Sequence, residues 1–147
     1  MFVTKSSLPR PVVKWAGGKR QLLGELAERC PGDFGNYFEP FFGGGALYLY
    51  LWRTGAIQGK AFLNDANPEL INLYRMIRDR TAELGDAMRN PAFVNTREAY
   101  LACRTRFNAI RGTEECVERA ALFLYLNHHG YNGLWRVNQK GEYNILF

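Results

Sequence analysis

The ten residues 37–46, YFEPFFGGGA, decide the fold of this 147-residue chain. Residues 37–39 predict a short strand that Pro40 and two phenylalanines close, and three glycines then lead into a helical run beginning at Ala46. Open α/β sheets bind ligands at the carboxyl ends of their strands, where glycines let a ligand approach the backbone. The stretch therefore predicts a ligand-binding loop, with glycines that merely turn the chain as the plainer alternative. The loop lacks Gly-x-Gly-x-x-Gly, which disfavours NAD and leaves other adenosine-bearing ligands open.

Strands and helices alternate on both sides of this stretch. Val12 and Val13 lead into Lys14 and Trp15 as a candidate strand, and residues 22–30 carry the apolar stripe of a helix. A third strand is expected at residues 60–64. Asn67 and Pro68 then predict the start of a long helix with one apolar face, formed by Leu70, Leu73, Tyr74 and Ile77. Such alternation predicts an α/β fold with a parallel sheet.

The alternation stops at about residue 95. A helix is expected with Tyr100, Cys103, Phe107 and Ile110 on one face. Residues 117–126 predict a second helix that is apolar nearly all round and therefore buried. Residues 134–138 and 142–145 flank a Gln-Lys-Gly turn, which predicts a β-hairpin.

Composition excludes several classes of protein. Hydrophobic residues make up 47% and charged residues 22%, which is ordinary for a folded globular chain. The longest apolar runs, residues 46–52 and 120–126, are far shorter than the ~20 residues that span a bilayer. No secretory signal is visible, so the expected location is the cytoplasm. Three scattered cysteines and two adjacent histidines lack the spacing of metal ligands, so no metal site is expected.

The net charge of +5 is concentrated at one end of the chain. Residues 1–20 hold five cations and no acid, whereas the other residues hold 14 of each sign. Such a cluster suits phosphate binding, because neutralising phosphate charge supplies most non-specific DNA affinity. A solvated terminus is the alternative.

Asp65 strengthens the ligand-binding interpretation of the glycine loop. It lies 20 residues after Gly45, at the expected end of the next strand. In α/β folds that bind nucleosides, an acid at this position accepts hydrogen bonds from ribose hydroxyls. The alternative is that Asp65 only begins the turn that Asn67 and Pro68 continue.

Four motifs in order resemble the Dam-type DNA adenine-N6 methyltransferases. They are KWAGGK at 14–19, FEPFFGGGA at 38–46, NDAN at 64–67, and FLYLN at 123–127 followed by YNGLWR at 131–136. The resemblance covers residues 10–147. It implies an incomplete Rossmann-like S-adenosylmethionine methyltransferase sheet, with a helical target-recognition insertion that ends in a β-hairpin. It also implies residues 1–94 as the donor-binding part and residues 95–147 as the start of the recognition domain.

Position by position, the resemblance implies two sets of site residues. The S-adenosylmethionine set comprises Trp15, Lys19, Glu39, Pro40, Phe41, Gly43, Gly45 and Asp65. A tryptophan ring suits the donor's sulfonium cation and a lysine suits its carboxylate, although core packing is the alternative for Trp15. The set implied to face duplex DNA comprises Lys14, Tyr131, Asn132, Leu134 and Arg136. An arginine can bond a guanine edge, and an apolar wedge can fill the space of a flipped base.

One departure from the family concerns catalysis. Family members carry, after the recognition domain, an Asp-Pro-Pro-Tyr segment that holds the flipped adenine, and this sequence contains no Asp-Pro. In addition, Leu146 stands where the family usually has proline. The resemblance therefore implies the amino-terminal portion of an enzyme, inactive alone, with GATC as the suggested target. With the remaining strands of the sheet missing, an unpaired sheet edge is expected at which a second chain or another copy could associate.

Two alternatives stay open from the sequence. The first is a non-catalytic DNA-binding remnant or one half of a split enzyme that recruits its catalytic half. The second is an enzyme with the same donor that acts on RNA or a small molecule, which the match to the recognition hairpin disfavours.

Overall fold

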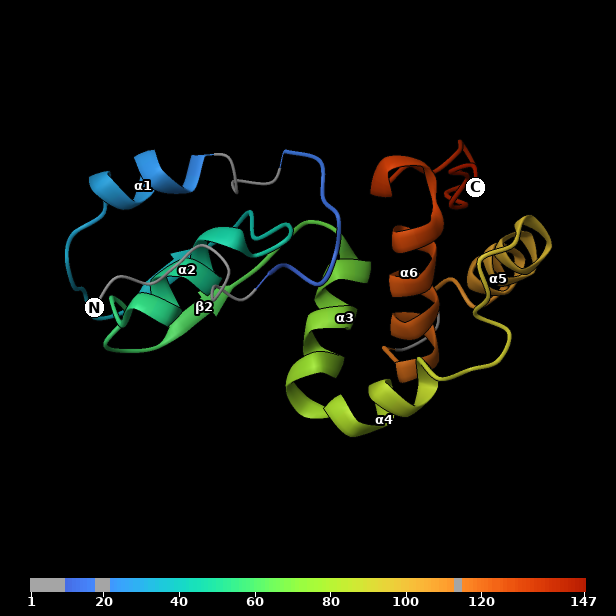
Figure 1. Cartoon of the computed structure of the whole chain (residues 1–147), viewed down its shortest axis with the longest axis horizontal. Helices are drawn as coiled ribbons and strands as arrows, with labels where there is room; N and C mark the ends of the chain where they lie inside the picture. Colours follow the sequence, from blue (N-terminus) through green and yellow to red (C-terminus); the bar gives the residue numbers. More distant parts are fainter. Residues whose placement is uncertain (1–9, 18–21, 113–114) are drawn as a thin grey trace. The chain divides into compact units, whose positions relative to one another are not determined.

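The computed structural model describes residues 10–17, 22–112 and 115–147, and these fall into two compact units. The first unit comprises described residues up to 66 apart from residues 13–16, which belong with residues 67–147 in the second. The described part holds six α-helices and one two-stranded parallel sheet (Figure 1). The expected mixture of helices with a parallel sheet is confirmed. None of its helices has the length and apolar character needed to span a bilayer.

The first unit is built on two parallel strands. It contains α1 (Leu23–Arg29), β1 (Tyr37–Glu39), α2 (Ala46–Thr54) and β2 (Ala61–Leu63). Tyr37 pairs with Ala61, and Glu39 pairs with Leu63. Parallel strands need a crossover connection, which α2 supplies between them. Both strands were expected, and both are confirmed.

The two faces of this sheet differ in exposure. Phe38 and Phe62 lie opposite each other in the register, with stacked rings whose centroids are 4.7 Å apart. They are 66% and 48% exposed. Glu39, whose neighbours along the strand point to the other face, is buried. Within this unit, one face of the sheet thus presents an open aromatic pair.

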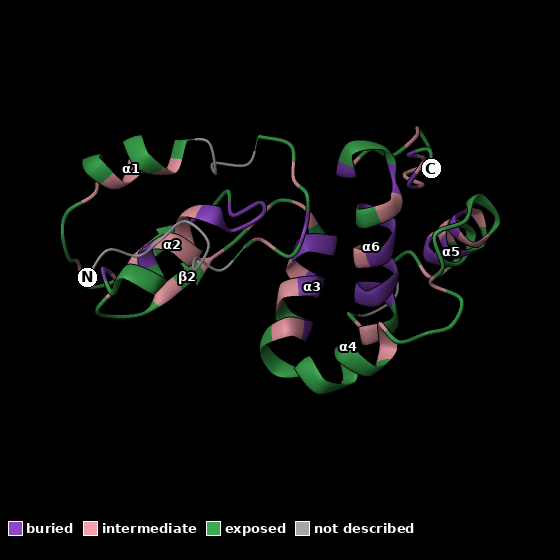
Figure 2. Cartoon of the chain, viewed as in Figure 1, coloured by how far each residue is buried: buried purple, intermediate pink, exposed green. Residues whose placement is uncertain are grey.

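The second unit is a helical assembly around α6 (Val117–His129). Its other elements are α3 (Pro68–Asp79), α4 (Thr81–Ala87), α5 (Arg97–Ala109) and the 3-10 turn η3 (Tyr131–Gly133). Helix α6 stands between α3 and α5 in Figure 1, and it packs on α3, α4 and α5. Figure 2 shows buried residues along its length, as expected for a helix that is apolar nearly all round. Helix α4 was not predicted.

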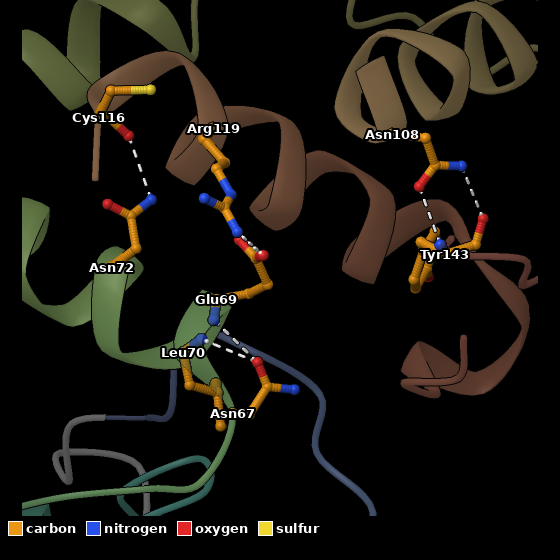
Figure 3. A network of polar contacts seen from close by, with 8 residues as sticks. All are labelled: Asn67, Glu69, Leu70, Asn72, Asn108, Cys116, Arg119 and Tyr143. Carbon is orange, nitrogen blue, oxygen red and sulfur yellow. Dashed lines mark hydrogen bonds and ion pairs between the residues drawn. The ribbon is translucent and has the colours of Figure 1, made fainter. Parts of the chain in front are cut away.

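A polar network fixes the start of α3 against α6 (Figure 3). Asn67 caps α3, as expected, by accepting hydrogen bonds from the backbone of Glu69 and Leu70. Glu69 forms a buried ion pair with Arg119 of α6. The side chain of Asn72 donates to the carbonyl of Cys116, the residue before α6, at 3.1 Å. These contacts set the relative position of the two helices.

The prediction of a strand at Val12 and Val13 is wrong. Neither residue lies in a strand, and Val13 is buried in the core of the second unit. The next residue, Lys14, bonds through its backbone N–H and carbonyl to the side chain of Asn127, each at 2.8 Å. A side chain therefore takes the backbone hydrogen bonds that a neighbouring strand would have supplied.

The expected hairpin is reduced to one antiparallel bridge between Val137 and Tyr143. A turn closes it, because Gly141 N–H donates to the carbonyl of Asn138 at 2.9 Å. Asn108 of α5 holds the second arm by bonding both the N–H and the carbonyl of Tyr143, at 2.8 and 3.0 Å (Figure 3). Side-chain contacts to α5 thus replace a longer ladder.

We predict that Glu69→Ala lowers the free energy of unfolding by about 3–5 kcal/mol, because it leaves the Arg119 guanidinium buried without its carboxylate. Urea unfolding followed by circular dichroism measures the loss. The matched control is Glu118→Ala, which breaks an exposed pair with Arg106 and should cost less than about 1 kcal/mol. Equal losses from the two variants would contradict a structural role for the buried pair.

Candidate functional site

The glycine loop joins the carboxyl end of β1 to the start of α2. Phe42 N–H donates to the carbonyl of Asn64 at 2.9 Å, and Gly45 N–H donates back to the carbonyl of Phe42 at 2.9 Å. Gly43 and Gly45 have φ angles of 54° and 72°, in the left-handed region that favours glycine. The loop is therefore a tight turn, bonded to the residues that follow β2.

Asp65 lies against this loop. Gly43 N–H donates to Asp65 Oδ2 at 2.8 Å, and the carboxylate is half-buried. The parallel pairing of β1 and β2 causes this meeting, because it brings the ends of both strands to the same edge of the sheet. The structure thus brings Asp65 and the glycine loop together.

Glu39 supplies a second carboxylate at the end of β1. It is 6% exposed and accepts a hydrogen bond from Tyr37 Oη at 2.8 Å. Burial, together with the hydrogen bond and charge of Glu39, raises the pKa of Tyr37 well above its ordinary value. Tyr37 therefore stays a neutral hydroxyl that donates to Glu39 at any ordinary pH.

The remaining loop residues are exposed. Pro40 is exposed, and the ring of Phe41 is 76% exposed. One end of this unit thus carries two carboxylates, tight glycine backbone and an exposed aromatic ring. Carboxylates accept hydrogen bonds from hydroxyl groups and attract cations, and an aromatic face receives a flat ring or a cation. Within the described residues, no group of His, Cys, Asp or Glu side chains is arranged to hold a metal ion.

Two predicted donor contacts lie elsewhere in the chain. Trp15 belongs to the second unit, where its ring meets Phe123 edge-on with centroids 6.4 Å apart. This is the core-packing alternative for Trp15, and its role toward a ligand stays a prediction. Lys19 lies outside the described residues.

All five predicted DNA-facing residues belong to the second unit, and four of them gather at the turn 131–134. Lys14 lies beside the turn 131–134, so close that a Cβ on Gly133 would be 2.3 Å from the Cβ of Lys14. The Lys14 ammonium donates to the carbonyl of His128 at 3.1 Å. The side chains of Lys14, Tyr131, Asn132 and Leu134 are all exposed. We call these four residues the Lys14 surface.

The turn after α6 contains two consecutive left-handed residues. Asn132 has a φ of 51° and Gly133 a φ of 63°, and Asn132 is the one non-glycine residue with positive φ in the part described. Glycine and asparagine are the residues that adopt this conformation most readily. Tyr131, which precedes them, is 63% exposed.

Arg136 lies further along, on the first arm of the hairpin. It is exposed, and its guanidinium donates to the Asn144 side chain at 2.9 Å. Asn144 N–H in turn donates to the carbonyl of Arg136 at 3.2 Å. The facing arm of the hairpin thus holds both the backbone and the side chain of Arg136.

Sequence reasoning missed Asn127, which holds Lys14 next to the turn. Asn127 belongs to the quoted FLYLN motif, but it received no role. The available signal was a lone amide at the end of an apolar helix, since a buried amide needs hydrogen-bond partners.

Comparisons with known proteins agree on one family. A family model described as D12 class N6 adenine-specific DNA methyltransferase matches residues 15–147. The type II methyltransferase M1.LlaDCHI of Lactococcus lactis subsp. cremoris is 42% identical over 94% of this chain and 47% of its own length. The type II methyltransferase M.MjaIII of Methanocaldococcus jannaschii is 36% identical over 94% and 52%. The DNA adenine methylase of Escherichia coli K12 is 39% identical over 94% and 47%. The chain thus spans about half the length of these curated relatives.

We predict that Gly45→Ala destabilises the first unit more than Gly55→Ala. Both glycines have nearly the same positive φ, so both changes carry a strain of about 1–2 kcal/mol. Only at Gly45 would the new Cβ collide with a neighbour, 2.4 Å from Cζ of the buried Phe42, which adds about 1–3 kcal/mol. Thermal unfolding of the two variants compares these losses, and equal losses would contradict the tight packing of the loop.

Proposed function

The chain belongs to the D12 class of N6 adenine-specific DNA methyltransferases, and we propose that it carries that family's donor-binding loop and part of its DNA-recognition surface. The proposed reaction of the complete enzyme is methyl transfer from S-adenosylmethionine to N6 of adenine in duplex DNA, with GATC as the target. The contact between Gly43 and Asp65 is the observation that carries this proposal.

The donor-binding half of the proposal rests on the end of the β1–β2 sheet. S-adenosylmethionine supplies a methyl group on a sulfonium cation, and it also carries a ribose, an adenine and a carboxylate. Asp65 and Glu39 suit the hydroxyl groups and the positive charge, and the glycine backbone admits a ligand closely. Phe41 offers an exposed face for a ring. Trp15 and Lys19 complete the proposed set, and the sheet is proposed to be the start of a Rossmann-like methyltransferase sheet.

The DNA-binding half rests on the second unit. The Lys14 surface combines a cation, an amide, an aromatic ring and an exposed leucine, which are groups that contact phosphates, base edges and unstacked bases. Arg136 is exposed, and an arginine can bond a guanine edge with two parallel hydrogen bonds. The recognition part is proposed to begin near residue 95.

A second candidate is favoured by the sequence itself. These 147 residues contain no Asp-Pro pair, and the family's adenine-holding loop begins with one. In this second candidate, these residues act as a non-catalytic DNA-binding protein, or as one half of a split enzyme. The open pair Phe38 and Phe62, together with the outer edges of β1 and β2, is where we propose that a second chain or another copy associates.

We predict that S-adenosylmethionine binds the chain and that Asp65→Ala weakens this binding at least about tenfold, because charged hydrogen bonds to the ligand are lost. Isothermal calorimetry measures the affinity. Asp65→Asn keeps an acceptor for Gly43, so its affinity for S-adenosylmethionine should lie between those of the unchanged chain and Asp65→Ala. Asp33 is an exposed acid in the same unit, and Asp33→Ala should leave the affinity unchanged. No heat of binding with the unchanged chain would contradict the donor site.

We also predict that a polypeptide of these 147 residues transfers no methyl group. The assay offers labelled S-adenosylmethionine with duplex DNA containing GATC or with RNA, and the E. coli DNA adenine methylase serves as the active control. Steady turnover on duplex DNA would refute the need for an Asp-Pro-Pro-Tyr segment, and turnover on RNA would refute the DNA assignment. Activity that appears only after adding a second chain with that segment would support the split enzyme.

A further inference from the structure

The carboxamide of Asn127 is bonded on every side to backbone groups. Asn127 lies near the end of α6 and is 2% exposed. Its Oδ1 accepts from Lys14 N–H at 2.8 Å, and its Nδ2 donates to the carbonyls of Lys14 at 2.8 Å and Gly133 at 3.1 Å. Both amide hydrogens are thus used, and they join two segments that lie 113 and 6 residues away in the sequence.

These bonds explain why a polar residue lies in this apolar part of α6. A buried amide without partners would destabilise the fold, so Asn127 is tolerated only because it satisfies backbone groups that no strand satisfies. One side chain thereby fixes the backbone of Lys14 against the carbonyl that ends the left-handed turn at Gly133.

We propose that Asn127 is a positioning residue for DNA binding: it fixes the Lys14 backbone beside the turn 131–134, so that the Lys14 side chain meets DNA from a preformed position. This inference rests on the proposed function, since it concerns the same DNA-facing residues.

The physical basis is preorganisation of a flexible side chain. A lysine has a long stem, and ordering it on binding costs conformational entropy. Here Asn127 fixes the backbone of Lys14. The Lys14 ammonium already donates a hydrogen bond to the carbonyl of His128, the residue after Asn127. The cation therefore meets DNA from a defined position. Because Trp15 follows Lys14 directly, the same bonds also fix the start of the Trp15 backbone.

A double-mutant cycle tests this proposal. The affinity of the full chain for a fluorescently labelled duplex containing GATC is measured for Asn127→Ala, Lys14→Ala and the double variant. If Asn127 acts through Lys14, its loss weakens binding about tenfold in the unchanged chain, but less than about threefold once Lys14 is alanine. The same factor in both backgrounds would overturn the proposal.

Asn108 provides the matched control. Its carboxamide bonds the N–H and carbonyl of Tyr143 in the same way, so the backbone that it holds is that of Tyr143 and not that of Lys14. Asn108→Ala should therefore change DNA affinity by the same factor with or without the Lys14 side chain. If the role of Asn127 were merely structural, Asn127→Ala would also change DNA affinity by the same factor with and without the Lys14 side chain.

Two further measurements keep the proposal testable if Asn127→Ala does not fold. Gly133→Ala separates the turn from Lys14 while Asn127 is retained, and it should show the same dependence on Lys14. In addition, amide hydrogen exchange at Lys14 should be slow in the unchanged chain, and fast exchange there would overturn the proposal. If the unchanged chain does not bind duplex DNA, the proposed function fails, whereas exchange at Lys14 separately reports whether Asn127 holds the segment.

Discussion

The candidate donor site depends on the parallel pairing of β1 with β2. Because the strands run in the same direction, the residues that follow each of them reach the same edge of the sheet. The glycine loop follows β1 and Asp65 follows β2, and the bond from Gly43 N–H to Asp65 joins them. Antiparallel pairing would send the two segments to opposite ends. The left-handed glycines let the loop turn within the few residues available before α2 begins.

In the first unit, paired strands satisfy backbone N–H and carbonyl groups. In the second unit, polar side chains satisfy such groups. Asn127 satisfies the backbone of Lys14, Asn108 satisfies the backbone of Tyr143, and Asn67 caps α3. Each of the three bonds backbone groups that regular structure leaves without partners. The helices supply the apolar core, and these amides fix the irregular segments that carry the proposed DNA contacts. Buried or half-buried asparagines thus hold in place the backbone segments on which the proposed DNA contacts lie.

Sequence patterns predicted the elements that depend on residues near one another in the chain. The glycine loop, the strands at 37–39 and 61–63, the Asn67 cap and the buried helix α6 all follow from turn chemistry and apolar spacing. The error at Val12 and Val13 has a different cause. Two β-branched residues suit a strand, but the partner of the next residue is a side chain 113 residues away, which local propensity does not register. The ion pair of Glu69 with Arg119 was missed for the same reason, since its members lie on separate helices. For the site, a family resemblance predicted the residues of the Lys14 surface. Asn127 stood in a quoted motif as a lone amide, but its bonds to Lys14 and Gly133 became visible only in the structure.

We propose that the end of the β1–β2 sheet binds S-adenosylmethionine. The most direct test is a two-dimensional amide spectrum of the isotope-labelled chain, recorded during titration with S-adenosylmethionine. We expect saturable shifts centred on the amides of Gly43, Gly44, Gly45 and Asp65, with smaller changes at the exposed hairpin. Shifts that avoid the glycine loop, or a spectrum that does not change at saturating S-adenosylmethionine, would contradict it.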